Sequence, residues 1–417
     1  MQMQVLARTF SSLKNPNFRY FWLGQCVSVM GTWIQRTAQT WLVYQMTKSA
    51  LLVGILSACQ FAPILALTLV AGTLIDRYPK RRILMLTQAG FLALGVIMTV
   101  IVLTGIVQYW MVLLIALGYG CLQSFDTPTR QSFVVELVGH KNLMNGISLN
   151  STVFNLAKIA GPSIAGILMV KFSVGICFLV DAVSYLAVLL GLFLIKQARV
   201  VATPSNKRVW EDVKDGLQYV WTHAEIRLSA IFMLIICTLN YNNNVIIPIF
   251  AKEVLHSGAQ TYANLLSATG VGSLIAAFLM SYLARFGLRR DFYLVVAVGT
   301  ASLQALMLLI RQTDLAMAMM VLIGFCNMIF LNQSNASFQF DIPNHLRGRI
   351  MSVYVLLNQG TTPIGSLFVG SVMDVAGGLW GFPACGLLAL ALLLPIMMRN
   401  RHMIAGWLHI GNNSTNS

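Results

Sequence analysis

The stretch LIDRYPKRR at residues 74–82 ends an apolar segment and sets one acid, Asp76, among four cations. A second stretch, YLARFGLRR at residues 282–290, ends another apolar segment and repeats three of those cations 208 positions later. Basic loops that recur at a fixed offset after apolar segments indicate an internal repeat. We therefore expect a chain built from two related halves.

The composition around these loops predicts a membrane protein. Of the 417 residues, 57% are apolar and 10% are charged, and the mean hydropathy is +0.73. The high apolar content excludes intrinsic disorder. Because a soluble domain carries about 25% charged residues, a soluble multidomain enzyme is not expected. A spanning helix needs roughly 20 apolar residues, and twelve segments qualify: 20–44, 51–75, 83–104, 110–135, 147–170, 174–195, 228–250, 262–284, 292–310, 315–338, 350–373 and 379–398.

The distribution of cations predicts the orientation. With the N-terminus in the cytoplasm, 22 of the 28 Lys and Arg residues fall in the tails and loops on the inner face, and four fall outside. Such a bias sets topology, and it accounts for the net charge of +15 without nucleic acid as a partner. We expect a multi-pass protein of the bacterial inner membrane with both termini in the cytoplasm.

The long polar stretch in the middle of the chain predicts the domain boundaries. Residues 1–195 and 228–400 are expected to form two pseudo-symmetric six-helix bundles, joined by a cytoplasmic linker at 196–227 and followed by a tail at 401–417. Two parallel repeats of six helices are typical of transporters, whose binding site lies near the midplane between the halves.

The loop at 74–82 has a charge pattern that suits a gate. Asp76 can accept hydrogen bonds from a neighbouring helix N-terminus, while Arg77 or Arg81 pairs with Glu136 or Asp126. Pairs of this kind would hold the cytoplasmic side closed and would break when it opens. The alternative is that these cations only anchor the topology, which requires no acid.

Three charges lie deep inside predicted spans: Arg36, Lys158 and Asp181. Each costs roughly 2.5–3.5 kcal/mol at that depth, so we expect Asp181 to pair with Lys158 or with Arg36. One acid against two bases leaves a positive excess that suits an anionic substrate or a coupled proton. A structural salt bridge is the alternative, and Asp126 is a further candidate for protonation.

Amide side chains gather on the segments expected to border a central cavity. The substrate candidates among them are Gln35, Gln39, Asn155, Asn240 and Asn243. Four asparagines within residues 240–244 are difficult to bury in lipid, so that region is expected to be hydrated or the helix to be broken there. Interhelical hydrogen bonds are an equal interpretation of any single amide.

Several motifs resemble the major facilitator superfamily. Gly72-x-Leu74-x-Asp76-Arg77-x-x-Lys80-Arg81-Arg82 is similar to the loop signature of that superfamily, and Gly161-Pro162-Ser-Ile-Ala165-Gly166 resembles its antiporter motif. Asp126-Thr-Pro128-Thr-Arg130-Gln-Ser132-Phe133 resembles the bacterial branch of the enterobactin exporter and macrolide-efflux-like proteins. The resemblance implies twelve helices of the major facilitator fold and adds Gly72 and Arg130 to the gate. It also implies that Gly161, Pro162 and Gly166 form a tight contact with a helix of the other half, with generic packing as the alternative.

These observations together predict a secondary transporter rather than an enzyme. The expected activity is proton-coupled export of a small amphipathic molecule, a siderophore or a drug, by alternating access. Import of a siderophore complex is the rival hypothesis, and a non-transporting membrane sensor is a third. The seven cysteines have no metal-ligand spacing, and the sequence contains no ATPase loop. We therefore expect no catalytic residue, metal or cofactor. The expected form of the protein is a monomer in the lipid bilayer.

Overall fold

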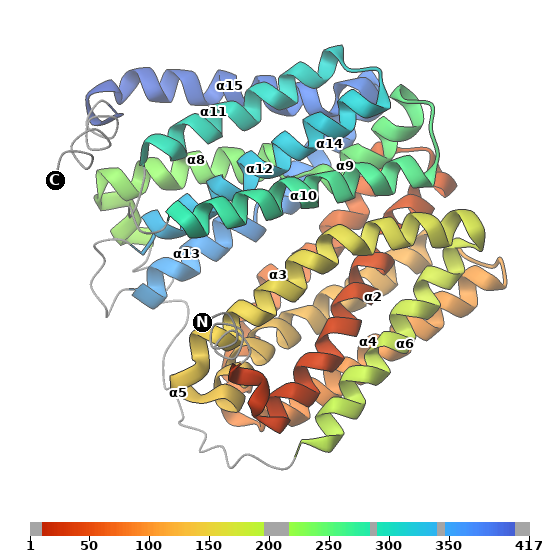
Figure 1. The fold of residues 1–417 in the computed structure, drawn as a ribbon. Coiled ribbons are helices and arrows are strands. Elements are labelled where there is room, and N and C mark those ends of the chain that lie inside the picture. Colours follow the sequence, from red (N-terminus) through yellow and green to blue (C-terminus); the bar gives the residue numbers. More distant parts are fainter. Residues whose placement is uncertain (1–10, 196–216, 284–289, 340–346, 405–417) are drawn as a thin grey trace, which may run out of the picture. The chain divides into compact units, whose positions relative to one another are not determined.

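The computed structural model of the protein describes residues 11–195, 217–283, 290–339 and 347–404. Within these ranges the regular structure is helical and contains no strand (Figure 1). Eight helices of the described residues are long and apolar enough to cross a membrane, and Ala50–Ile64 is a shorter apolar helix. The all-α membrane fold predicted from the composition is confirmed.

The first half of the chain folds into a short 3-10 helix, η1, followed by five α-helices. They are η1 (Ser11–Lys14), α2 (Pro16–Thr47), α3 (Ala50–Arg77), α4 (Lys80–Leu103), α5 (Tyr109–Lys171) and α6 (Val174–Leu194). Helix α5 contains the predicted segments 110–135 and 147–170, and it is interrupted at Gly139, whose φ is 66° and ψ is 169°. A positive φ of this kind carries little cost for glycine, so one residue turns the chain between the two segments.

From Ala224 onward, the described residues of the second half form eight α-helices and three short helical turns. They are α8 (Ala224–Asn240), α9 (Asn243–Ile249), η2 (Phe250–Val254), α10 (Ala259–Leu283), α11 (Arg290–Leu306), η4 (Met307–Leu309), α12 (Thr313–Ser337), α13 (Arg347–Gln359), α14 (Thr362–Ala376), η5 (Gly378–Trp380) and α15 (Gly381–Arg399). Two predicted spans are therefore interrupted: 228–250 after Asn240, and 350–373 at Gly360–Thr361. The first break falls within the asparagine cluster, as one of the two sequence interpretations expected.

The chain separates into two compact units. The first comprises Met1–Thr47 and Ala62–Asn206, and the second comprises Lys48–Phe61 and Lys207–Ser417. Residues 48–61, at the start of α3, thus group with the second unit, because Gly54 and Gly370 allow close backbone approach between α3 and α14. Of the linker and tail expected from the sequence, residues 196–216 and 405–417 lie outside the described residues. Pro63, two residues after Phe61, lies inside α3.

The same helix pairs pack together in both units. In the first unit, α2 packs on α5 and α6, and α4 packs on the same two helices. In the second unit, α8 packs on α13, α14 and α15, and α11 packs on α12 and α15. In each unit, the first span (α2 or α8) and the third span (α4 or α11) therefore pack against the later spans of the same unit. This shared packing agrees with the internal repeat that the basic loops indicated.

The outward faces of these helices are apolar. Leu86, Phe193 and Leu309 are 74%, 72% and 74% exposed. Side chains of this size exposed on so many helices suit a lipid environment, where lipid tails replace the protein core as their neighbours. The polar side chains described next are buried inside the units.

Candidate functional site in the first unit

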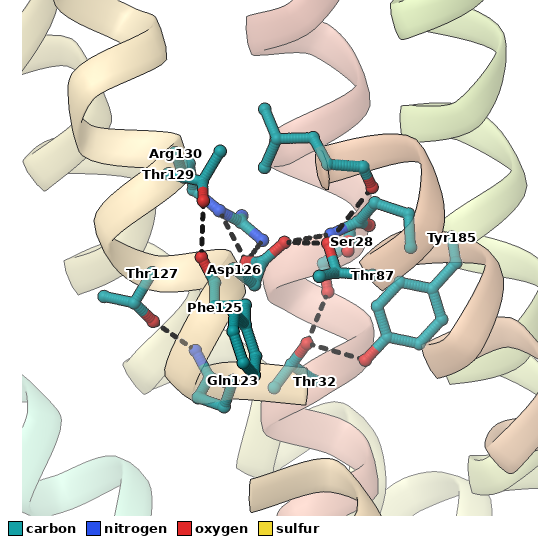
Figure 2. A network of polar contacts seen from close by, with 12 residues as sticks. Ser28, Thr32, Thr87, Gln123, Phe125, Asp126, Thr127, Thr129, Arg130 and Tyr185 are labelled. Carbon is teal, nitrogen blue, oxygen red and sulfur yellow. Dashed lines mark hydrogen bonds and ion pairs between the residues drawn. The ribbon is translucent and has the colours of Figure 1, made fainter. Parts of the chain in front are cut away.

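A buried carboxylate, Asp126 of α5, lies at the centre of a polar network with α4 (Figure 2). Thr87 Oγ1 donates to Asp126 Oδ1 at 2.9 Å, and Gln88 Nε2 donates to the same oxygen at 2.8 Å. Arg130, one turn further along α5, forms an ion pair with Asp126 Oδ2, and its Nε donates at 3.0 Å. The charge of Asp126 is therefore balanced locally, which suits a structural or gating role better than proton transfer.

The cations at the start of α4 have partners other than the expected ones. Lys80 forms an ion pair with Glu136 of α5, a role that the sequence assigned to Arg77 or Arg81. Arg81 donates instead from Nε to Leu192 O at 2.7 Å and from Nη2 to Phe193 O at 3.1 Å. These carbonyls end α6, where a helix leaves its last oxygens without backbone donors. The expected pairing of Arg81 was therefore wrong, because the end of α6 competes for its guanidinium.

Three further gate candidates cannot be placed in these contacts. Gly72, Asp76 and Arg77 belong to α3, but their side chains lie outside the described residues. Arg285 and Arg289 of the second basic loop also lie outside the described residues. A gating role for these residues remains a prediction.

A second buried carboxylate, Asp181 of α6, has no ion-pair partner among the described residues. Tyr119 of α5 donates its hydroxyl to Asp181 Oδ2 at 3.1 Å, and Oδ1 has no hydrogen-bond partner in the described part of the chain. The direct pair that the sequence predicted with Arg36 or Lys158 is therefore not formed at this carboxylate. The tyrosine hydroxyl takes that place because α5 carries it to within hydrogen-bond distance.

Aromatic rings surround Asp181 and connect it to α4. Phe91 of α4 stacks on Tyr119 and on Tyr185, with ring centroids 5.5 and 5.3 Å apart. The hydroxyl of Tyr185 lies 3.4 Å from Thr32 Oγ1, which donates to Ser28 O at 3.0 Å (Figure 2). Asp181 thus lies beside a layer of stacked rings. The hydroxyl groups of the two tyrosines in this layer, Tyr119 and Tyr185, both have hydrogen-bond partners.

A glycine allows the close packing of α2 on α6 beside this carboxylate. A Cβ at Gly31 would lie 3.1 Å from Asp181 Cα and 2.9 Å from Ser184 Cβ. Both distances are tighter than ordinary contact between carbon atoms. Glycine is therefore required at position 31 for Thr32 to reach Tyr185.

The two deep cations of the first unit lie on different helices, Arg36 on α2 and Lys158 on α5. The guanidinium of Arg36 lies 6.0 Å from the ring of Trp33, and it is within electrostatic range of Asp181 and Tyr185. Lys158 is partly buried on α5, where Asn155 Nδ2 donates to Ser151 O at 2.9 Å.

Two amide candidates lie on α2 close to Arg36 in the sequence. Gln35 Nε2 donates to Gln39 Oε1 at 2.8 Å, and both side chains are buried. Two of the amide candidates are therefore joined to each other by a hydrogen bond along α2.

One residue of the antiporter-type motif of α5, Gly161, packs on a helix of its own unit. The atoms nearest to a Cβ at Gly161 are those of Trp33, with Trp33 Cβ at 2.5 Å. Pro162 and Gly166 are buried, and the helix continues through them. The sequence predicted a helix of the other half as the neighbour of Gly161. Gly161 approaches α2 of the same unit because it has no side chain to keep α2 away. The contact of the motif with a helix of the other half remains a prediction.

The sequence interpretation did not identify Tyr119, Tyr185, Phe91 or Thr32. These residues are uncharged, and apolar or aromatic residues are common in any span. The available signal was Tyr185 four positions after Asp181, which places it on the same helix face. In the second unit, the candidates Asn240 and Asn243 lie on either side of the break between α8 and α9.

Comparisons with known proteins agree with this architecture. The profile of the transmembrane secretion effector family matches residues 7–407. The staphyloferrin A transporter of Staphylococcus aureus is 24% identical over 388 residues, covering 92% of this chain and 96% of that protein. The multidrug efflux pump Tap of Mycolicibacterium fortuitum is 25% identical over 358 residues, covering 83% and 87%.

Solved structures share the fold. The nucleoside transporter NupG superposes with a TM-score of 0.75 at 9% identity, covering 92% of this chain and 98% of that chain. A bacterial homologue of the iron transporter ferroportin in an inward-facing state gives a TM-score of 0.67 at 16% identity, covering 91% and 98%. At these identities the likeness concerns the fold alone.

The apolar helices, the family match and the transporters among the relatives define a multi-pass membrane transport protein for small molecules rather than an enzyme. The chain belongs to the transmembrane secretion effector family of the major facilitator superfamily. The superfamily that the loop motifs predicted is therefore confirmed.

Proposed function

We propose that the chain exports a small amphipathic molecule across the inner membrane in exchange for protons, with siderophores as the first substrate class and hydrophobic drugs as the second. Two relatives support these classes, since one is named a staphyloferrin A transporter and the other a multidrug efflux pump. The proposed unit is a monomer of twelve spans in the lipid bilayer, with both termini in the cytoplasm, working by alternating access.

The proton coupling in this proposal depends on Asp181. A buried carboxylate without an ion-pair partner is costly in a membrane span. Taking up a proton removes its charge while Tyr119 remains its neighbour, and losing the proton restores the attraction of Arg36. Asp181 is thus the proposed coupling residue, and Asp126 is not, because Arg130 already balances its charge.

The cations Arg36 and Lys158 are the proposed basis of substrate charge preference. Both lie in spans of the first unit, and both are only partly buried. An anionic substrate, such as a carboxylate or catecholate siderophore, would offset a positive charge that is costly in a span. A neutral drug would gain less from these two side chains.

The experiment compares a deletion strain with its parent, with and without iron, by mass spectrometry of medium and cells. Export predicts that one anionic metabolite disappears from the medium and accumulates in the deletion strain. Wild-type and Asp314→Asn chains should restore its export, because Asp314 is exposed at the start of α12. Asp181→Asn should not restore it, although this change keeps the size and an acceptor for Tyr119.

Import, the second candidate, predicts the opposite distribution. The name of the staphyloferrin A transporter states no direction, and alternating access has none built in. In that case the metabolite or its iron complex would remain in the medium of the deletion strain and decrease in its cells. Unchanged metabolites and drug susceptibility in the deletion strain would contradict both directions.

A further inference from the structure

The second unit contains a helix break surrounded by buried amides. Helix α8 ends at Asn240 and α9 begins at Asn243, while Tyr241 and Asn242 between them have ψ values of 18° and 24°. Two hydrogen bonds connect this break to neighbouring helices. Gln304 Nε2 of α11 donates to Asn240 O at 3.0 Å, and Tyr241 donates its hydroxyl to Asn327 O of α12 at 2.6 Å.

The amide nitrogens at this break are directed to the end of α8. Asn242 Nδ2 donates to Thr238 O at 2.7 Å and to Leu239 O at 3.1 Å, and Gln304 Nε2 donates to Asn240 O. A carbonyl can only accept, so these contacts fix which atom of each amide is nitrogen. The oxygens of Asn242 and Gln304 are therefore directed away from these carbonyls.

Most of the side-chain amide atoms that remain without a partner at the break are acceptors. Among the described residues, five buried amide oxygens and one amide nitrogen here have no hydrogen-bond partner. The oxygens belong to Asn240, Asn242, Asn243, Gln304 and Asn327, and the nitrogen belongs to Asn240. An excess of buried acceptors favours a ligand that brings positive charge or several donors.

The electrostatics of the break favour a cation. The C-terminal end of α8 carries the negative end of the helix dipole, and interrupted membrane helices use such ends and nearby carbonyl oxygens to hold cations. The Asp and Glu side chains of the second unit whose exposure is described are all exposed, so no described carboxylate is buried at the break. Neutral oxygens alone suit a single positive charge better than two.

Burial limits the size of the ligand. Asn240 and Gln304 are both 0% exposed, and Gly365 of α14 closes on Asn242, since a Cβ there would lie 2.8 Å from Nδ2. Helices α8, α11 and α12 pack against one another around the break (Figure 1). Such a site has no room for an amphipathic substrate, but it suits a single small ion.

We propose that the break between α8 and α9 binds one monovalent alkali-metal cation, held by the amide oxygens of Asn240, Gln304 and Asn327. The site differs from Asp181 in unit, residues and chemistry, and it does not depend on proton coupling. Its immediate effect is to stabilise the interrupted helix.

The test measures thermal unfolding of the purified full-length protein in NaCl, KCl and N-methyl-D-glucamine chloride at equal ionic strength. Binding to the folded state predicts a saturable rise of several degrees in the unfolding temperature with Na⁺ or K⁺ over N-methyl-D-glucamine. Gln304→Met keeps the length of the side chain and removes its oxygen, so it should weaken the cation affinity at least tenfold. Asn240→Asp adds a negative charge and should strengthen it.

Gln25→Met is the matched control. Gln25 of α2 is 1% exposed and both of its amide atoms lack a partner among the described residues, but it lies within a continuous helix. This variant should keep the full Na⁺ or K⁺ shift. Equal unfolding temperatures in all three salts would overturn the proposal and indicate that ordered water satisfies these amides.

If Gln304→Met does not fold, binding of ²²Na⁺ to the wild-type protein decides the question. Retained ²²Na⁺ that excess unlabelled NaCl displaces would support the site. No retained label, or displacement by MgCl₂ more readily than by NaCl, would overturn it. A Gln304→Met variant that folds and keeps the full salt shift would also overturn it.

Discussion

Gly31 gives a direct test of how closely α2 and α6 must pack beside Asp181. In Gly31→Ala, the added Cβ would lie 2.9 Å from Ser184 Cβ and 3.1 Å from Asp181 Cα, whereas carbon atoms prefer about 3.5–4.0 Å. The two helices must therefore separate by roughly half an ångström or more. Because Thr32 Oγ1 and the Tyr185 hydroxyl are already 3.4 Å apart, this separation breaks their contact.

The expected cost follows from two opposing effects. Overpacking a close contact costs about 1–3 kcal/mol, and replacing a helical glycine by alanine returns about 0.8–1.0 kcal/mol. The net loss is therefore about 0–2 kcal/mol, which corresponds to an unfolding temperature lower by up to roughly 8 °C for a unit of this size. Transport should fall further than stability predicts, because Tyr185 and Asp181 lose their alignment.

The assay combines thermal unfolding in detergent with transport in membrane vesicles. Gly299→Ala is the control, since the one atom near a Cβ at that position in α11 is Cys326 Sγ, at 3.9 Å. That variant gains helix propensity without overpacking, so its stability should be unchanged or higher. If Gly31→Ala were as stable as Gly299→Ala and transported normally, the packing argument would be refuted.

Two further predictions concern the polar contacts of the first unit. Lys80→Glu and Glu136→Lys should each lower transport several-fold, because each variant places two like charges together. The double variant should recover most of the lost transport in the same vesicle assay. No recovery would contradict a role for the ion pair itself. Tyr119→Phe removes the hydroxyl that donates to Asp181 Oδ2 and should change the pH dependence of transport with little change in unfolding temperature. An unchanged pH profile would contradict coupling through this carboxylate.

Much of the fold was predictable because apolar length and basic loops are strong signals in a membrane chain. Each of the twelve predicted segments overlaps one or more helices of the structure. The asparagine cluster suggested either a hydrated region or a broken helix, since consecutive amides are difficult to bury in lipid, and the structure has a break after Asn240. The near continuity of α5 was not predictable, because a single glycine with positive φ replaced the expected loop.

The candidate site was less predictable than the fold. The residue types correctly indicated that Asp126 and Asp181 are buried, but not which donors would reach them. Lys80 and Arg81 are neighbours in one loop, and only the packing of α4 decides that one reaches Glu136 and the other the end of α6. Tyr119 carries no charge, so no cost argument identified it as the donor to Asp181.

Helix α3 has a mechanical consequence for any movement of the two units. Its residues up to Phe61 group with the second unit and its residues from Ala62 with the first, yet it is one continuous helix. Pro63 lies at that division and cannot donate the backbone hydrogen bond that would stiffen it. In the proposed alternating access, a rotation of one unit would bend α3 at this point, and the elastic resistance of a single helix turn would add to the barrier for that rotation.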